Sequence, residues 1–149
     1  MIIAAACLTL ISITSVAIAH KGATGIVKVR MDAMKDISTQ MKLMKKMIRS
    51  KQPYDAVRFK NAAETIAKHG LDIPKQFPKG SAHKPSRAKI GIWQDWEKFS
   101  DLTRNLTVNA KTLAEMAEAT STPKTLRRTF GKLAKTCKAC HKTFRQKKR

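Results

Sequence analysis

The chain has 149 residues, with 31 Lys and Arg against 10 Asp and Glu, and its formal net charge is +21. This length predicts a single domain, and the charge predicts a surface that attracts acidic proteins or an anionic membrane surface. The lysines are spread along predicted helix faces, only 5% of the residues are aromatic, and no nucleic-acid-binding motif occurs. We therefore do not expect nucleic acid to be a partner.

Residues 1–19 have the features of a secretory signal peptide. They contain no charged side chain, and Ala17-Ile18-Ala19 matches the small-x-small pattern that precedes a signal peptidase cut. The apolar stretch is shorter than the ~20 residues that a membrane span needs. We therefore expect an exported, periplasmic domain of residues 20–149, from which Cys7 has been removed and in which two cysteines remain.

Apolar residues at helical spacing predict a first helix over about residues 24–51. Arg30 falls on a predicted buried line of this helix, and a buried charge needs an anionic partner because its desolvation is costly. Pro53 ends the helix, and a second helix is predicted over about residues 55–69, with Gly70 as its stop. The predicted buried positions of the two helices are Val27, Met34, Ile37, Met41, Met44, Ile48, Val57, Phe59, Ala62, Ala63 and Ile66.

Residues 71–91 contain three prolines and two glycines and predict a long irregular connection. A third helix is predicted over about residues 92–120, and a fourth opens at Thr122-Pro123 with proline at its first helical position. The predicted buried positions are Ile92, Trp96, Phe99, Leu106, Ala110, Leu113 and Ala117, then Leu126, Phe130, Leu133, Cys137, Cys140 and Phe144. Four amphipathic helices with one long crossing predict an all-α, antiparallel four-helix bundle.

The pentapeptide Cys137-Lys138-Ala139-Cys140-His141 is the C-x-x-C-H signature of c-type haem attachment. On a helix the two thiols share one face, where they can add to the two vinyl groups of a porphyrin, and His141 can ligate the iron. A structural zinc site would need four Cys or His ligands, and the other three histidines form no second pair. A thioredoxin-like dithiol would need a strand before the motif. We expect one covalently bound haem c, enclosed by the bundle, with these two alternatives less favoured.

Further motifs occur along the exported chain. They are Arg30 four residues before Met34, Phe77-Pro78-x-Gly80-Ser81, Ile92-Trp93-x-x-Trp96-x-x-Phe99, and Arg145 one turn after the C-x-x-C-H motif. With these motifs the chain resembles a class II cytochrome c of the cytochrome c-prime family. The resemblance implies that Met34 faces the iron opposite His141 and ligates it, as in the low-spin c-556-like branch. It also implies that Arg30 and Arg145 neighbour the haem propionates.

The other methionines of the first helix, Met31, Met41, Met44 and Met47, are expected to fill the core. We expect a one-electron carrier rather than an enzyme with catalytic residues, and the high positive charge predicts an acidic redox partner. The alternative is a five-coordinate, cytochrome c-prime-like protein that binds a gas such as nitric oxide. The oligomeric state is expected to be a monomer or a homodimer.

Overall fold

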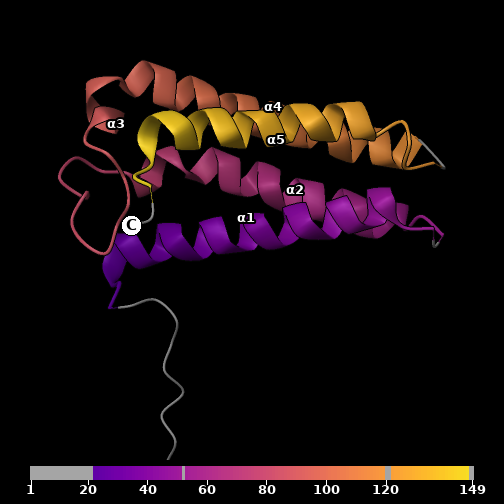
Figure 1. The fold of residues 1–149 in the computed structure, drawn as a ribbon, viewed down its shortest axis with the longest axis horizontal. Helices are drawn as coiled ribbons and strands as arrows, with labels where there is room; N and C mark the ends of the chain where they lie inside the picture. The colour runs from indigo at the N-terminus through magenta and orange to yellow at the C-terminus, as the bar shows by residue number, and fades with distance from the viewer. Residues whose placement is uncertain (1–21, 52, 120–121, 148–149) are drawn as a thin grey trace, which may run out of the picture.

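The computed structural model describes residues 22–51, 53–119 and 122–147. The predicted signal peptide, residues 1–19, lies outside the described residues. No strand forms in the described part of the chain, so the all-α prediction is confirmed. The elements, shown in Figure 1, are α1 (Gly25–Arg49), α2 (Ala56–Asp72), the 3₁₀ helix η1 (Pro74–Gln76), α3 (Gly91–Gln94), α4 (Trp96–Ala119) and α5 (Arg127–Phe144).

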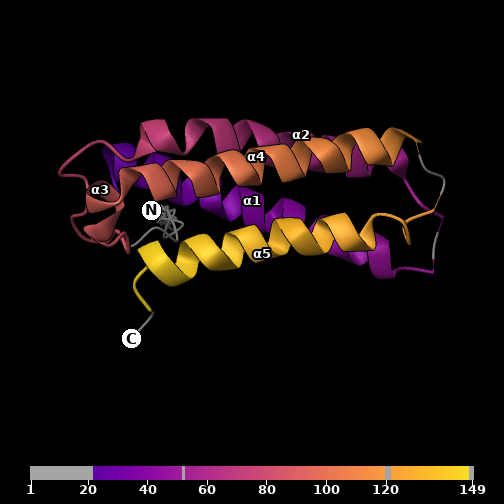
Figure 2. The same ribbon diagram turned by 90° about the horizontal axis from the view of Figure 1, so that it is seen from above.

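The four long helices run along one axis, and each is antiparallel to the long helix before it (Figures 1 and 2). α1 packs mainly against α2, α2 against α4, and α4 against α5. The start of α1, the end of α5, α3 and the connection after α2 lie at the same end of the bundle (Figure 1). This is the predicted antiparallel four-helix bundle. None of the described helices is both long and apolar enough to cross a bilayer.

The core is built from the helix faces that the apolar spacing predicted. Phe59 of α2 and Phe99 and Leu113 of α4 are all buried. Two predicted core positions are wrong, because Val57 exposes 69% and Trp96 40% of its surface area. Both residues belong to the first turn of their helix, where fewer neighbouring turns cover a side chain.

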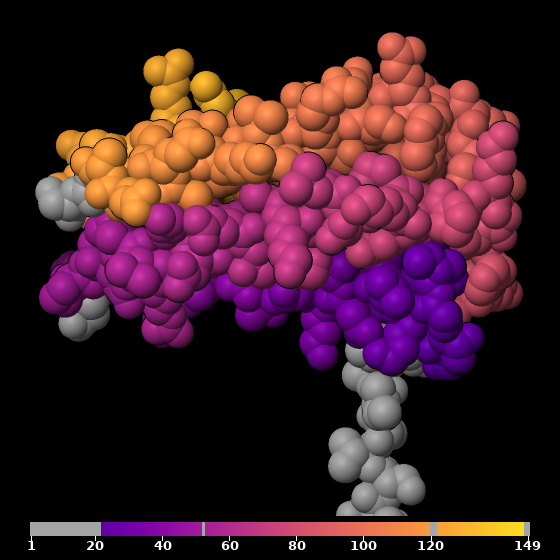
Figure 3. Space-filling model, turned by 180° about the vertical axis from the view of Figure 1, so that it is seen from behind, coloured from indigo at the N-terminus to yellow at the C-terminus, as the bar shows by residue number. Residues whose placement is uncertain are grey.

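α2 continues through Gly70 to Asp72, whereas the sequence predicts that it stops at Gly70. A Cβ atom at Gly70 would lie 2.4 Å from the Oγ1 atom of Thr107 in α4. The glycine therefore lets α2 and α4 approach closely, and it does not end the helix. Figure 3 shows α2 and α4 in contact on the face that lies behind the view of Figure 1.

Two other helix boundaries differ from the prediction. The predicted third helix is interrupted at Asp95 (φ −127°, ψ 59°), which separates α3 from α4. The last helix begins at Arg127 rather than at Pro123, because residues 123–126 form turns and Leu126 is the N-cap. The fixed φ of proline suits a turn as well as a helix start.

Candidate functional site

A cavity of about 620 Å³ lies between α1, α4, α5 and the connection after α2. Its volume is within the range of about 300–1,000 Å³ that is typical of cofactor sites. Phe99 lies in its wall and makes edge-on contacts with Phe77 and Phe144, at ring-centroid distances of 5.0 Å and 5.5 Å. The branched aliphatic side chains in the wall are Ile37, Ile73, Ile92, Leu102 and Leu106. The cavity is therefore an apolar space inside the bundle.

α5 places the C-x-x-C-H motif in one wall of this cavity. Cys137 and Cys140 are free, half-buried thiols, and His141 lines the cavity although much of its side chain remains exposed. Burial raises the pKa of Cys137, and burial together with the neighbouring Cys137 raises the pKa of Cys140 to about 11. Desolvation, followed by the positive charges of Arg145 and Arg87, lowers the pKa of His141. The imidazole is thus favoured in its neutral form, which is the form that binds a metal.

α1 places three methionines in the same cavity. Met31, Met34 and Met41 line it, whereas Met44 is buried in the core. The prediction that Met44 fills the core is confirmed. Met41 and Met47 are partly buried and pack against the core, as predicted. Met31, which was also predicted to fill the core, lines the cavity wall together with Met34 and Met41. Thioether groups therefore lie on α1, while the thiols and the imidazole lie on α5.

Arg30 is buried, as its place on the predicted core line required, with 3% of its surface exposed. Its guanidinium donates hydrogen bonds to the Oγ (2.9 Å) and carbonyl oxygens of Ser81 and to the carbonyl oxygen of Gln76 (3.4 Å). It also lies 4.7 Å from the centre of the Phe77 ring. These described partners are neutral, whereas the sequence predicts an anionic one. Desolvation lowers the pKa of Arg30, and the side chain still lines the cavity.

Arg145 lines the cavity at the end of α5, where its backbone N–H donates to the carbonyl oxygen of His141 at 3.2 Å. Arg87 lies beside it and donates from Nε to the carbonyl oxygen of Gln146 at 3.0 Å. Lys89 Nζ donates to the carbonyl oxygen of Thr143 at 3.0 Å. The bond to Thr143 satisfies a carbonyl group that the end of α5 leaves without a helical partner. The bond to Gln146 holds the segment that follows the helix. The connection before α3 therefore holds the helix end that carries the motif.

Sequence reasoning missed Arg87, because a single arginine in a long basic connection carries no distinguishing pattern. In the folded chain Arg87 joins Arg30, Lys35 and Arg145 around the cavity, and no Asp or Glu is among the described residues that line it. Four cations and no carboxylate favour an anionic group at the cavity edge. Two of these four residues, Arg30 and Arg145, were named as candidate site residues from the sequence alone.

The donor set fits a haem. Two thiols and an imidazole lie in one wall, thioethers lie in the wall on α1, and cations at the edge match the two carboxylates of a porphyrin. Among the described residues, no group of three or more His, Cys, Asp and Glu is arranged to hold a metal ion directly. The described chain also has no strand to provide the context of a thioredoxin-like dithiol.

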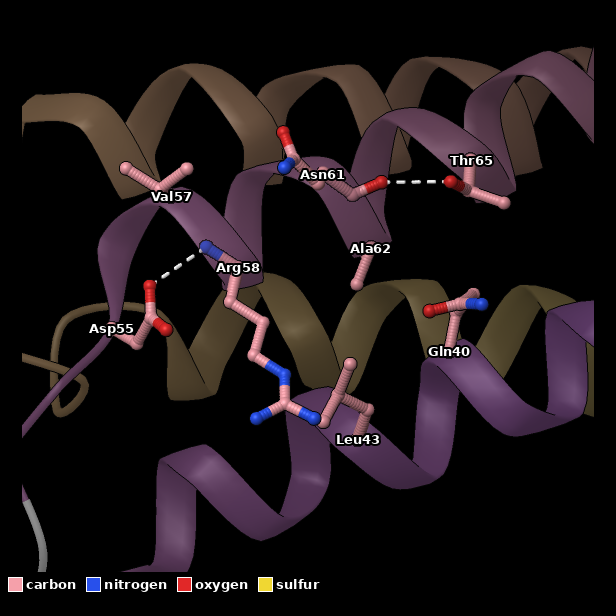
Figure 4. Close-up of a pocket in the computed structure, with 8 residues that line it drawn as sticks. All are labelled: Gln40, Leu43, Asp55, Val57, Arg58, Asn61, Ala62 and Thr65. Atoms are coloured by element: carbon pink, nitrogen blue, oxygen red, sulfur yellow. Dashed lines mark hydrogen bonds between the residues drawn. The ribbon is translucent and has the colours of Figure 1, made fainter.

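A second hollow, of about 470 Å³, lies between α1 and α2 and is open to solvent. Figure 4 shows its eight lining residues, which include Asp55, Asn61 and Thr65. Asp55 accepts a hydrogen bond from the backbone N–H of Arg58 at 2.8 Å, and Thr65 donates to the carbonyl oxygen of Asn61 at 2.8 Å. These bonds are local to α2. The hollow contains no thiol, imidazole or thioether.

Comparisons with known proteins agree with this site. The family model described as Cytochrome C' matches residues 25–145. Cytochrome c-556 of Agrobacterium tumefaciens (strain II Chrys) is 33% identical over 125 residues, which cover 83% of this chain and 99% of the relative. Cytochrome c' of Pararhodospirillum photometricum is 31% identical over 121 residues, which cover 80% of this chain and 95% of the relative.

Solved structures show the same fold. Cytochrome c prime from Shewanella frigidimarina superposes with a TM-score of 0.74 and 27% identity, over 82% of this chain and 94% of that one. A ferrous variant of cytochrome c prime from Alcaligenes xylosoxidans with bound NO gives a TM-score of 0.73 and 27% identity, over 83% of this chain and 94% of that one. The protein belongs to the cytochrome c' family, whose members carry one covalently attached c-type haem.

Proposed function

We propose that this protein is an exported one-electron carrier whose haem iron is ligated by His141 and Met34. The observation that carries the proposal is the position of Met34. This thioether lines the cavity from α1, whereas the attachment cysteines and His141 line it from α5. Methionine and histidine together are a well-used axial pair in electron-transfer haem proteins.

Each residue would have a distinct role in such a site. Cys137 and Cys140 would hold the haem by thioether bonds, and His141 would bind the iron on the side of α5. When bound, the haem supplies a one-electron Fe(III)/Fe(II) couple. The side chains around Phe99 give the cavity a mostly apolar wall. We assign no catalytic residue, because a carrier of this kind needs no substrate site.

Arg30 and Arg145 are our candidates for contact with the haem propionates. Both line the cavity, and both are cations where no described acidic residue lies. Arg30 is fixed by Ser81 and Gln76, so its position is set before any anion binds. Arg145 is exposed, and its backbone N–H donates a hydrogen bond to the carbonyl oxygen of His141.

The relative named cytochrome c-556 supports the proposal, because the c-556-like branch is the one whose resemblance implies a methionine ligand, and the match covers 99% of that relative. Proteins of the cytochrome c' family are generally periplasmic in bacteria, and the predicted signal peptide agrees with that location. We propose an acidic redox protein as the partner. A relative whose structure is described as having a ligand-controlled dimer dissociation makes a monomer or a homodimer the expected state.

The alternative function is gas binding at a five-coordinate haem. It is favoured by the solved relative with bound NO. The two functions differ at Met34, because a ligating thioether occupies the position that a gas would take. The alternative would require this methionine to pack in the cavity without binding the iron.

Absorption spectra of the oxidised and reduced holoprotein test the proposal. A low-spin spectrum with a weak sulfur-to-iron charge-transfer band is expected in the oxidised protein. Met34→Leu keeps the volume and removes the sulfur, and it should give a high-spin form that binds nitric oxide or carbon monoxide readily. Met31→Leu and Met41→Leu are the matched controls and should leave the spectrum unchanged. A high-spin wild type would support the gas-binding alternative.

A further inference from the structure

The cavity has one side that the bundle does not close. α1 packs against α2, α2 packs against α4, and α4 packs against α5. The described helices α1 and α5 have no comparable packing between them. Half-buried or exposed residues of both helices line the cavity there, among them Met34, Lys35, Cys137 and Cys140. Figure 1 shows α5 on the viewer's side, and Figure 3 shows α2 and α4 on the opposite face. The cofactor would therefore be approached between α1 and α5.

α5 is cationic along its whole exposed surface. No Asp or Glu occurs in the sequence after Glu118. The exposed cations of this segment in the described chain are Lys124, Arg127, Arg128, Lys132, Lys135, Lys138, Lys142, Arg145 and Lys147. No acidic neighbour in sequence is present to form an ion pair with these cations. Two of them have a further contact, because Arg127 donates to the carbonyl oxygen of Ile48 at 3.4 Å and Arg145 lines the cavity.

α1 contributes a second row of cations on the other side of the opening. Lys35 lines the cavity, and Lys42 and Arg49 follow it at intervals of seven residues on the same face of the helix. All three are exposed. No acidic residue occurs between residues 37 and 54. We call the exposed cations of α5 together with Lys35, Lys42 and Arg49 the cationic face.

The α2–α4 side of the molecule differs, although it also contains lysines. Eight of the ten acidic residues lie between residues 55 and 118. Several of them pair with cations, at 2.7 Å for Lys60–Glu118 and 2.7 Å for Arg104–Asp101. The positive charge is therefore concentrated around the cavity opening, and its field is directional.

We propose that the cationic face is the docking surface for an acidic redox protein, which it orients with its redox centre toward the opening between α1 and α5. This inference rests on the proposed function as an electron carrier. An electron-transfer partner has to approach the haem edge, and charges on both sides of the opening would steer it there.

The composition of the cationic face favours a protein over a lipid surface. A membrane-binding helix places large apolar side chains beside its basic ones. The large apolar side chains that are exposed in the described chain are Val29, Val57, Leu71, Ile90, Trp96 and Val108. None of these side chains lies in α5. Only Val29 lies in α1, and it comes before Met34.

The experiment compares two triple variants of the holoprotein that lose the same amount of charge. Lys42→Glu, Lys135→Glu and Lys142→Glu change the cationic face, whereas Lys68→Glu, Lys98→Glu and Lys111→Glu change α2 and α4. The probe is a reduced, acidic plant-type ferredoxin, whose potential of about −400 mV makes electron transfer to the haem favourable. Stopped-flow gives the second-order rate constant against ionic strength, and calorimetry gives the affinity of the complex.

The first variant should lower the rate constant at low ionic strength by about tenfold or more and flatten its salt dependence. The affinity should fall in parallel, and the α2–α4 variant should change both values much less. Equal losses in the two variants would overturn the proposal, because net charge alone would then explain the rate. The proposal would also be overturned if the first variant lost only its binding to vesicles of phosphatidylglycerol and kept its rate with ferredoxin.

The hydroquinone of riboflavin, a small uncharged reductant of low potential, separates this proposal from the one on which it rests. All three proteins should be reduced by it at the same rate and to the same low-spin spectrum. A wild-type protein that fails this test contradicts the electron-carrier function itself. Normal reduction by the riboflavin hydroquinone combined with no difference between the variants contradicts only the docking surface.

Discussion

Arg30 shows what a single residue can and cannot reveal before folding. Its place on an apolar helical line predicted a buried charge, and the structure buries it. Its partners come from Ser81 and Gln76, about fifty residues away in the chain. No local pattern in the sequence indicates that the connection after α2 will fold back against α1. The sequence therefore could not show that Ser81 and Gln76 are the partners of Arg30.

The two cysteines carry the most direct prediction at this scale. Cys137→Ala or Cys140→Ala should each remove one thioether link, and the double variant should have no covalent haem, because no other cysteine lies in the predicted exported chain. Extraction with acidified acetone and the mass of the remaining polypeptide measure this. Haem that resists extraction in the double variant would contradict the assignment. Thr143→Ala, outside the motif, should keep its haem.

Between helices, the contact of α2 with α4 depends on Gly70. Gly70→Ala should destabilise the protein by about 1–3 kcal/mol, because its Cβ would meet Thr107 Oγ1 at 2.4 Å. Chemical denaturation of the holoprotein measures the loss. Gly131→Ala in α5 is the control, since nothing lies within 4 Å of its Cβ, and it should stabilise the helix by up to about 1 kcal/mol.

A double-mutant cycle makes this prediction specific. Thr107→Ala removes the Oγ1 atom, so the cost of Gly70→Ala should be smaller in that background. If the cost is the same with and without the hydroxyl, the close approach of the two helices at this point is not what requires glycine.

α1 and α2 are joined by a pH-dependent contact. His69 Nε2 lies 2.8 Å from Asp36 Oδ2, and this hydrogen bond, followed by one from Gln40, lowers the pKa of Asp36. A carboxyl whose folded-state pKa lies below its unfolded value of about 3.9 stabilises the fold above that pH. The contribution is lost as the pH falls through the folded-state pKa.

Asp36→Asn should therefore reduce the free energy of unfolding at pH 6, by less than about 1 kcal/mol because the carboxyl is partly exposed. The difference from wild type should shrink toward pH 2. Urea titrations at the two pH values measure it, with Glu115→Gln as a control for the loss of an exposed carboxylate. A difference that is the same at both pH values would show that the Asp36 carboxylate does not stabilise the fold through its lowered pKa.

For the whole molecule, a net charge of +21 means strong self-repulsion in the folded state. Added salt screens charges beyond a Debye length of about 10 Å at 0.1 M. The urea midpoint of the holoprotein should therefore rise between low salt and 0.5 M salt, by an amount that corresponds to about 1 kcal/mol. Sodium chloride and sodium fluoride at equal ionic strength separate screening from binding of a particular anion. A midpoint that falls with both salts would contradict the prediction.

The sequence by itself determined the features that are contiguous or periodic. The haem motif could be identified because its three functional residues lie within five positions, and the four long helices because apolar residues recur with the helical period. Helix ends were less predictable. Gly70 and Pro123 are typical of boundaries, but the packing against Thr107 and the turn at residues 123–126 decided their roles.

Only the tertiary structure decided which residues share the cavity and which side of it is open. Arg87, Arg145 and Met34 come from three separate segments, and their meeting depends on how α1, α5 and the connection pack at one end of the bundle. Spacing along the chain holds no information about such contacts between distant segments. For the same physical reason the net charge of +21 follows from the sequence alone, but its concentration around the opening follows only from the fold.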